Sequence, residues 1–94
     1  MRKVTFFYIQ GCPYCANARK ARAELIAENA SYKDIDFDEI DEMAHPEISD
    51  NYDYQATPAM YIGEELIYQA HVGEPYDECK EHMKEVMDRA LASA

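Results

Sequence analysis

Val4-Thr5-Phe6-Phe7-Tyr8-Ile9-Gln10-Gly11-Cys12-Pro13-Tyr14-Cys15 is the stretch that decides the fold. Its first six residues are β-branched or aromatic throughout, which is typical of a strand buried on both faces at the centre of a partly parallel sheet. Gln10-Gly11 ends this strand. Residues 13–29 are mostly strong helix formers, and Pro13 suits the first helical position, where no backbone donor is needed. The stretch therefore predicts a strand that leads directly into a helix.

Two cysteines lie at this junction and are the candidate reactive groups. Cys12 falls at the predicted N-cap, where free backbone N–H groups and the positive end of the helix dipole favour a thiolate. The thiolate is the form of cysteine that attacks a disulfide. Cys15 lies one turn further on, where a more buried thiol is expected to attack the resulting mixed disulfide. We therefore expect a redox-active Cys12–Cys15 disulfide and no bound cofactor.

A zinc site is the alternative explanation for a C-x-x-C pair. Zinc needs about four ligands. The third cysteine, Cys79, belongs to another predicted helix, no second C-x-x-C exists, and the histidines are scattered at positions 45, 71 and 82. The sequence therefore favours redox chemistry and predicts no metal, with surface or capping roles for the histidines.

The rest of the chain supplies the other strands and helices. An alternating pattern predicts a second strand over 32–37, and the acidic residues 38–55 allow short helices, one of which starts at Pro46. A hairpin is predicted over 59–62 and 65–70. A final helix is predicted over 75–91, with an apolar stripe formed by Tyr76, Cys79, Met83, Val86, Met87 and Ala90. The order β-α-β-α-β-β-α predicts an α/β fold with a four-stranded mixed sheet and helices on both faces.

Length and charge narrow the class of protein. The 94 residues correspond to one domain, expected to span 1–94. The net charge is −10, and residues 34–94 hold seventeen acidic side chains against three basic ones, which excludes the basic surface of a typical nucleic-acid binder. The apolar run after Met1 is too short for a signal peptide or a membrane span. We expect a cytoplasmic monomer that binds neither nucleic acid nor membrane.

Several short motifs occur together in this chain. They are Phe6-Phe7-Tyr8-Ile9, Gly11-Cys12-Pro13-Tyr14-Cys15, Ala18-Arg19 and Ala56-Thr57-Pro58. With this set the chain resembles the glutaredoxin family of the thioredoxin superfamily over almost its whole length. The resemblance implies a thioredoxin-like fold and a thiol-disulfide oxidoreductase. Its partners would be disulfide-containing protein substrates, with a reductase or a low-molecular-weight thiol as the electron donor.

The resemblance also assigns roles to individual residues. It implies that Pro58 is cis and packs beside the cysteines, and that the Thr57 backbone pairs with bound substrate like an added strand. It places Pro13, Tyr14 and Gly73 in the substrate site as well. Tyr14 is otherwise interpreted as a surface aromatic residue, and both interpretations stay open at this stage.

The chain also departs from the glutaredoxins that use glutathione. Those proteins carry Lys or Arg three residues before the first cysteine, where this chain has Ile9, and a Gly-Gly-x-Asp-Asp-like turn that is only partly kept here. In this turn Glu74 adds a negative charge and Pro75 lacks a backbone N–H that could bind a carboxylate. Residues 52–73 resemble thioredoxin itself more closely. Glutathione is therefore a possible electron donor, but we expect it to be a poor one.

Three further side chains have alternative interpretations. Cys79 is interpreted as a helix residue near the core, because free cysteine behaves as a small apolar side chain, and a regulatory thiol is the alternative. Arg19 and Lys20 either stabilise the thiolate or face water. For the whole protein, the alternative to an enzyme is a redox-sensing or adaptor domain that binds a partner protein without turnover.

Overall fold

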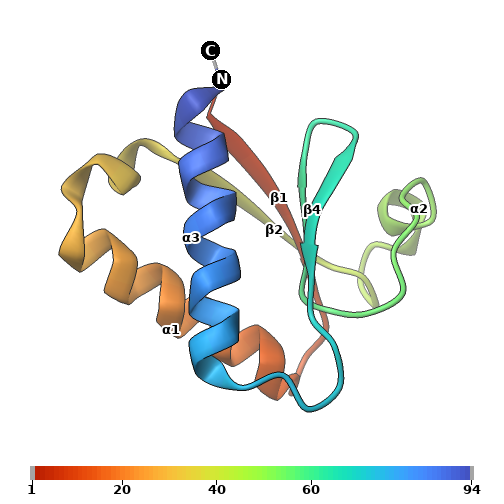
Figure 1. Cartoon of the computed structure of the whole chain (residues 1–94). Coiled ribbons are helices and arrows are strands. Elements are labelled where there is room, and N and C mark those ends of the chain that lie inside the picture. The colour runs from red at the N-terminus through yellow and green to blue at the C-terminus, as the bar shows by residue number, and fades with distance from the viewer. Residues whose placement is uncertain (1, 94) are drawn as a thin grey trace.

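The computed structural model describes residues 2–93 as a sheet flanked by helices (Figure 1). The elements are β1 (Lys3–Tyr8), α1 (Pro13–Glu28), the 3₁₀ helix η1 (Ala30–Asp34), β2 (Asp36–Asp41), α2 (Pro46–Ser49), β3 (Ala59–Ile62), β4 (Glu65–Gln69) and α3 (Tyr76–Ala92). The strands form a mixed sheet in the order β2-β1-β3-β4. β1 pairs in parallel with β2 and antiparallel with β3, and β3 pairs antiparallel with β4. The predicted α/β fold with a four-stranded mixed sheet is confirmed.

Strand β1 lies at the centre of the sheet, as its composition predicts. Val4, Phe6 and Phe7 are fully buried, and Thr5 is nearly so. Because successive side chains of a strand point to opposite faces, this burial requires a layer of structure on each side of the sheet.

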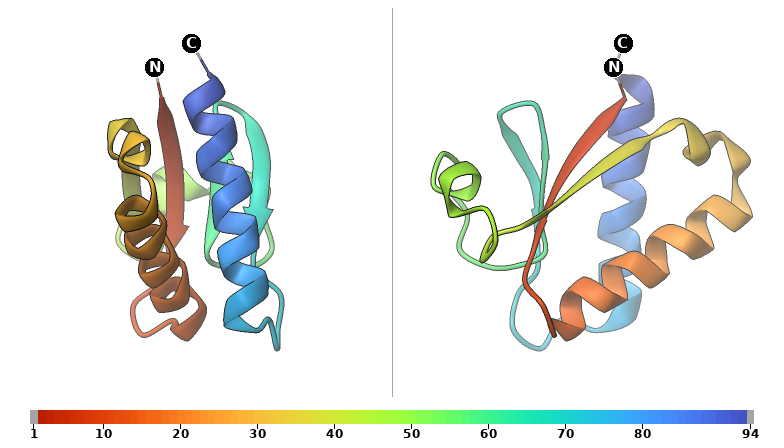
Figure 2. Two further views of the ribbon diagram at one scale, coloured as in Figure 1. Left: turned by 60° about the vertical axis from the view of Figure 1, so that its left-hand side comes forward. Right: turned by 180° about the vertical axis from the view of Figure 1, so that it is seen from behind.

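Those two layers differ in size. Helices α1 and α3 lie side by side on one face, where they build the larger core with Val4 and Phe6 of β1 (Figure 2). The other face is covered by α2 and the segment that follows it, which pack Ile48, Tyr52 and Tyr54 against Phe7 and its neighbours. Helices therefore cover both faces, as predicted.

The hairpin and the last helix also match their predictions. Gly63 forms the turn between β3 and β4 with a φ of +61°, a conformation that glycine adopts without strain. Helix α3 buries Cys79, Met83, Val86, Met87 and Ala90 along one stripe. Among the described residues 2–93, no helix is long and apolar enough to cross a membrane.

The predicted second strand over 32–37 is wrong in its position. Residues 30–34 form η1, capped by Asn29, whose side-chain Oδ1 accepts the N–H of Ser31 at 3.1 Å. Tyr32 is buried and its hydroxyl donates to a carboxylate oxygen of Asp88 on α3. The strand itself runs from Asp36 to Asp41. Tertiary contacts of Tyr32 thus override the local alternation that predicted a strand.

The acidic composition of β2 fits its position at the edge of the sheet. An edge strand has one unpaired side, and charged side chains keep that side in water. Basic residues of the N-terminal third neutralise some of these charges: Arg19 and Arg22 of α1 both contact Glu39, at 2.9 and 3.0 Å. The uneven distribution of charge along the sequence is therefore partly compensated in the folded protein.

Candidate active site

The junction between β1 and α1 places Cys12 at the helix N-cap, as predicted. Gly11 turns the chain with a φ of +75°, and Cys12 then adopts an extended conformation before Pro13 starts the helix. The Cys12 Sγ accepts the backbone N–H of Cys15 at 3.1 Å. Cys12 is half-buried and lines a hollow in the surface, so it can be reached from solvent. A negative charge on this sulfur would be stabilised by that N–H and by the helix dipole.

Cys15 has a different environment, one turn into the helix. It is completely buried on the face of α1 that packs on the sheet. Burial, together with the neighbouring Cys12 sulfur, raises the pKa of the Cys15 thiol to about 12. Near neutral pH this thiol therefore stays protonated. The expected pair of an accessible Cys12 and a buried Cys15 is present.

A second segment reaches Cys12 from the start of β3. The Thr57–Pro58 peptide bond is cis, as the resemblance implies, and Pro58 is fully buried. The Cys12 Sγ lies 3.7 Å from the carbonyl oxygen of Thr57 and 3.8 Å from its Oγ1. Thr57 is therefore the residue of this loop that contacts the accessible sulfur.

A third segment, the turn between β4 and α3, contacts the same motif through Tyr14. The Gly73 N–H donates a hydrogen bond to the Tyr14 hydroxyl at 2.7 Å, and Gly73 has a φ of +82°. Tyr14 is half-buried and packs against the larger core. Tyr14 therefore connects the cysteine motif to the turn through this hydrogen bond, and it is not an isolated surface aromatic residue.

Ile9 lines two hollows in the surface, one of which is also lined by Cys12. One hollow, of about 320 Å³, is lined by Ile9, Cys12 and Pro13 among others. The other, of about 290 Å³, is lined by Ile9, Glu42 and Thr57 among others. Both hollows thus present the uncharged, apolar side chain of Ile9, beside Arg19 in the first and Glu42 in the second.

The two cations near the motif are already engaged. The Arg19 guanidinium contacts Glu39 and lies 4.6 Å from the centre of the Tyr8 ring. The Lys20 ammonium lies 4.5 Å from the centre of the Tyr76 ring. Both side chains therefore interact with neighbouring residues of the scaffold, and neither has a described contact with the Cys12 sulfur.

The expected negative charge of Glu74 in the turn is a prediction that the structure corrects. The side chain of Glu74 is 1% exposed and points into the protein. Its carboxylate accepts the hydroxyl of Tyr68 and, at 3.3 Å, the backbone N–H of His71. The inward direction of Glu74 could not be predicted from the sequence, because the residues from Gly73 to Pro75 have the composition of an exposed turn.

Cys79 lies in the core, as expected. It is 2% exposed on α3, and burial raises the pKa of its thiol. A protonated, inaccessible thiol is a poor nucleophile. Cys79 is therefore a packing residue next to Tyr68 and Glu74.

Replacement of Cys79 by Ser is expected to preserve disulfide-reducing turnover and to lower stability, because a hydroxyl needs a hydrogen-bond partner in a site shaped for sulfur. Turnover and urea unfolding of the same sample separate the two effects. A large fall in turnover by folded Cys79→Ser protein would show that this thiol takes part in the reaction.

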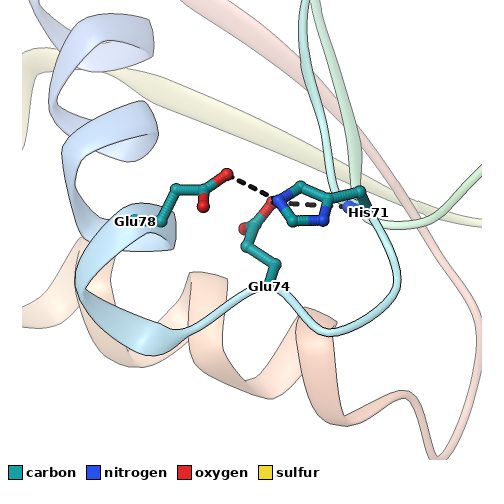
Figure 3. Close-up of side chains that lie close together, drawn as sticks. All are labelled: His71, Glu74 and Glu78. Atoms are coloured by element: carbon teal, nitrogen blue, oxygen red, sulfur yellow. Dashed lines mark hydrogen bonds and ion pairs between the residues drawn. The ribbon is translucent and has the colours of Figure 1, made fainter.

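The sequence interpretation missed a cluster formed by His71, Glu74 and Glu78 (Figure 3). His71 lies in the turn after β4, and Glu78 lies in the first turn of α3. The signal that could have found it is the H-x-x-E-x-x-x-E spacing over residues 71–78, in which each side chain follows the previous one by three or four positions.

Comparisons with known proteins support the fold. No family model and no curated protein matches the chain. Among solved structures, thioredoxin 1 from the thermophilic eubacterium Thermosipho africanus TCF52B superposes with a TM-score of 0.55 and 21% identity, covering 94% of this chain and 97% of that one. This chain therefore has a thioredoxin-like fold, with two cysteines at the start of its first helix.

Proposed function

We propose that this protein is a glutaredoxin-like thiol-disulfide oxidoreductase that reduces protein or mixed disulfides through Cys12 and Cys15. The observation that carries the proposal is the asymmetry of the pair. The Cys12 sulfur is accessible and receives the backbone N–H of Cys15, whereas the Cys15 thiol is buried directly behind it. The Cys12 sulfur can therefore react with a substrate disulfide, whereas the Cys15 sulfur can react only with Cys12.

In the first step the Cys12 thiolate attacks one sulfur of a substrate disulfide. A bond forms between the Cys12 Sγ and that sulfur, the substrate S–S bond breaks, and the other substrate sulfur leaves as a thiolate that takes up a proton. The Thr57 carbonyl, 3.7 Å from the Cys12 Sγ, is placed to accept a backbone N–H of an extended substrate.

In the second step Cys15 attacks the Cys12 Sγ of the mixed disulfide. The bond to the substrate breaks, its second sulfur leaves and is protonated, and the Cys12–Cys15 disulfide forms. Burial is the largest cause of the high pKa of Cys15, and the hydrogen bond with the Cys12 sulfur is the second largest. Because Cys12 carries no charge in a mixed disulfide, its formation lowers that pKa and makes Cys15 easier to deprotonate. An external dithiol or reductase then restores both thiols.

The experiment that tests this proposal is turnover of the reduced full-length chain with insulin as the disulfide substrate and dithiothreitol as the electron donor. The expected result is reduction of insulin faster than by dithiothreitol alone. A folded protein that binds disulfide-containing partners without accelerating their reduction would support the adaptor alternative instead.

We further propose that the electron donor is a dithiol or a reductase rather than glutathione. Ile9 offers no cation to a glutathione carboxylate, and the Gly73 N–H is already bonded to the Tyr14 hydroxyl. Pro75, which precedes α3, has no N–H to donate. Glu74 contributes nothing to this argument because its carboxylate points inward.

The substitution Ile9→Lys is expected to raise glutathione-supported turnover by up to about fivefold, since an exposed ion pair contributes up to about 1 kcal/mol and 1.4 kcal/mol is a factor of ten. Turnover with dithiothreitol should change little. Ile9→Met, which keeps the size and adds no charge, is the matched control. Wild-type protein that already turns over efficiently with millimolar glutathione would contradict the proposal.

The proposed setting is a reducing compartment such as the cytoplasm, where a regenerating thiol system is available and both cysteines return to the dithiol form. We propose a monomer whose partners are disulfide-containing proteins, because the proposed exchange needs only the two cysteines of a single chain. Sedimentation of the reduced protein checks the monomeric state.

A further inference from the structure

A cluster of potential metal ligands lies where the turn after β4 meets α3 (Figure 3). The Nε2 atom of His71 is 2.6 Å from a carboxylate oxygen of Glu78 and 3.7 Å from one of Glu74. One ligand atom from each of the three residues lies within 4.8 Å of the others. The ligands of a tetrahedral Zn²⁺ ion, at about 2.0–2.1 Å from the metal, are about 3.3 Å apart. The two distances from the His71 Nε2 atom bracket that value, so small shifts of the side chains would fit an ion.

The cluster has the chemistry that a zinc-type ion prefers. It offers one imidazole nitrogen and two carboxylate oxygens, which are all atom types that bind Zn²⁺, and three such ligands leave a fourth position for water. Two ionised carboxylates together supply a charge of −2, which would balance the charge of a divalent cation. The imidazole distinguishes this set from the all-oxygen sites that calcium and magnesium favour.

Two of the three ligands, His71 and Glu74, are held in place by other residues. The Nδ1 atom of His71 lies 3.2 Å from the carbonyl oxygen of Val72, an arrangement that fixes the ring with Nε2 directed at the carboxylates. Metal-binding histidines have such a partner on their second nitrogen. Glu74 is buried and its other carboxylate oxygen accepts the Tyr68 hydroxyl, so its position is also fixed.

The third ligand, Glu78, lies on the side of the cluster that is exposed to solvent. Its side chain is about one-third exposed and that of His71 more than half exposed. His82, one turn further along α3, has its Nε2 atom 3.4 Å from the Glu78 oxygen, and its ring stacks on Tyr68. The His71 and Glu78 side chains of the cluster are therefore open to solvent, whereas the Glu74 side chain is buried.

We propose that His71, Glu74 and Glu78 form a binding site for one divalent transition-metal ion of the zinc type, separate from the cysteine pair. The ion replaces a proton on the His71 Nε2 and joins the turn to α3. Gly73, which donates to Tyr14, lies within the segment that the ion would hold. The ion would thus fix the turn against the cysteine motif. The site does not depend on the proposed oxidoreductase activity.

Zinc titration of the full chain tests the proposal, in a background of Cys12→Ser with Cys15→Ser so that the dithiol cannot bind the metal. Calorimetry with Zn²⁺ alone, at slightly alkaline pH and without thiols or chelating buffer, should show saturable binding of one ion per chain. Zn²⁺ in hundredfold excess over the dissociation constant should raise the thermal midpoint by on the order of 10 °C.

The variants His71→Ala and Glu78→Gln should each weaken zinc binding by about tenfold or more. Both side chains are at the surface, so both variants are expected to fold, which circular dichroism checks. The matched control is His45→Ala, because the exposed His45 contacts a single carboxylate, Glu47, at 3.2 Å; it should leave affinity unchanged. Absence of saturable binding up to about millimolar Zn²⁺, or unchanged affinity in His71→Ala, would overturn the proposal.

Discussion

Replacement of Cys12 by Ser is expected to abolish disulfide reduction, and replacement of Cys15 by Ser to trap the substrate on Cys12. The first variant lacks the sulfur that meets the substrate. The second forms the mixed disulfide but has no buried thiol to release it. Non-reducing electrophoresis of each variant after mixing with a protein disulfide, followed by mass spectrometry of any adduct, checks both outcomes.

Ala16→Ser is the matched control for these two variants. Ala16 is exposed on the same turn of α1, so this change introduces a serine there without removing a thiol. It should keep wild-type turnover. An adduct that accumulates on Cys15 in the Cys12→Ser protein, or preferential alkylation of Cys15 in the wild type near neutral pH, would reverse the roles assigned to the two cysteines.

The substitution Phe7→Ala is expected to lower the free energy of unfolding by about 3–5 kcal/mol, out of a typical total of about 5–15 kcal/mol. Phe7 is fully buried, and its ring centre lies 4.7 Å from that of Tyr52 and 5.0 Å from that of Tyr54. These tyrosines belong to the segment that leads to Thr57. The loss should therefore also loosen the loop that contacts Cys12.

Urea unfolding measures the effect, with Phe37→Ala as the control. Phe37 lies on the edge strand β2, half-buried beneath the Arg22 guanidinium, whose carbon is 4.9 Å from the ring centre. Its loss should cost about 1–2 kcal/mol. Equal losses in the two variants would show that the smaller of the two cores is not organised around Phe7.

The elements that the sequence predicts well are those whose local preference agrees with their burial. The apolar residues of β1, the Pro13 start of α1 and the stripe on α3 all lie where their composition places them. The N-cap position of Cys12 follows from the same junction. The candidate site could be located from one continuous stretch of chain for this reason.

Features that depend on distant partners could not be predicted in the same way. Tyr32 leaves the strand pattern because Asp88 on α3 binds its hydroxyl, and the strand starts four residues later than predicted. Glu74 turns inward because Tyr68 offers a buried hydroxyl. The bond between Gly73 and Tyr14 joins residues 59 positions apart. No local pattern encodes such pairings.

The most direct test of the central claim is a single-turnover reaction of the fully reduced protein with less than one equivalent of a protein disulfide, quenched with acid and mapped by mass spectrometry. We expect each reduced substrate molecule to be matched by one Cys12–Cys15 disulfide, with the Cys79 thiol unchanged. A disulfide that includes Cys79, or reduced substrate without oxidation of Cys12 and Cys15, would contradict the account.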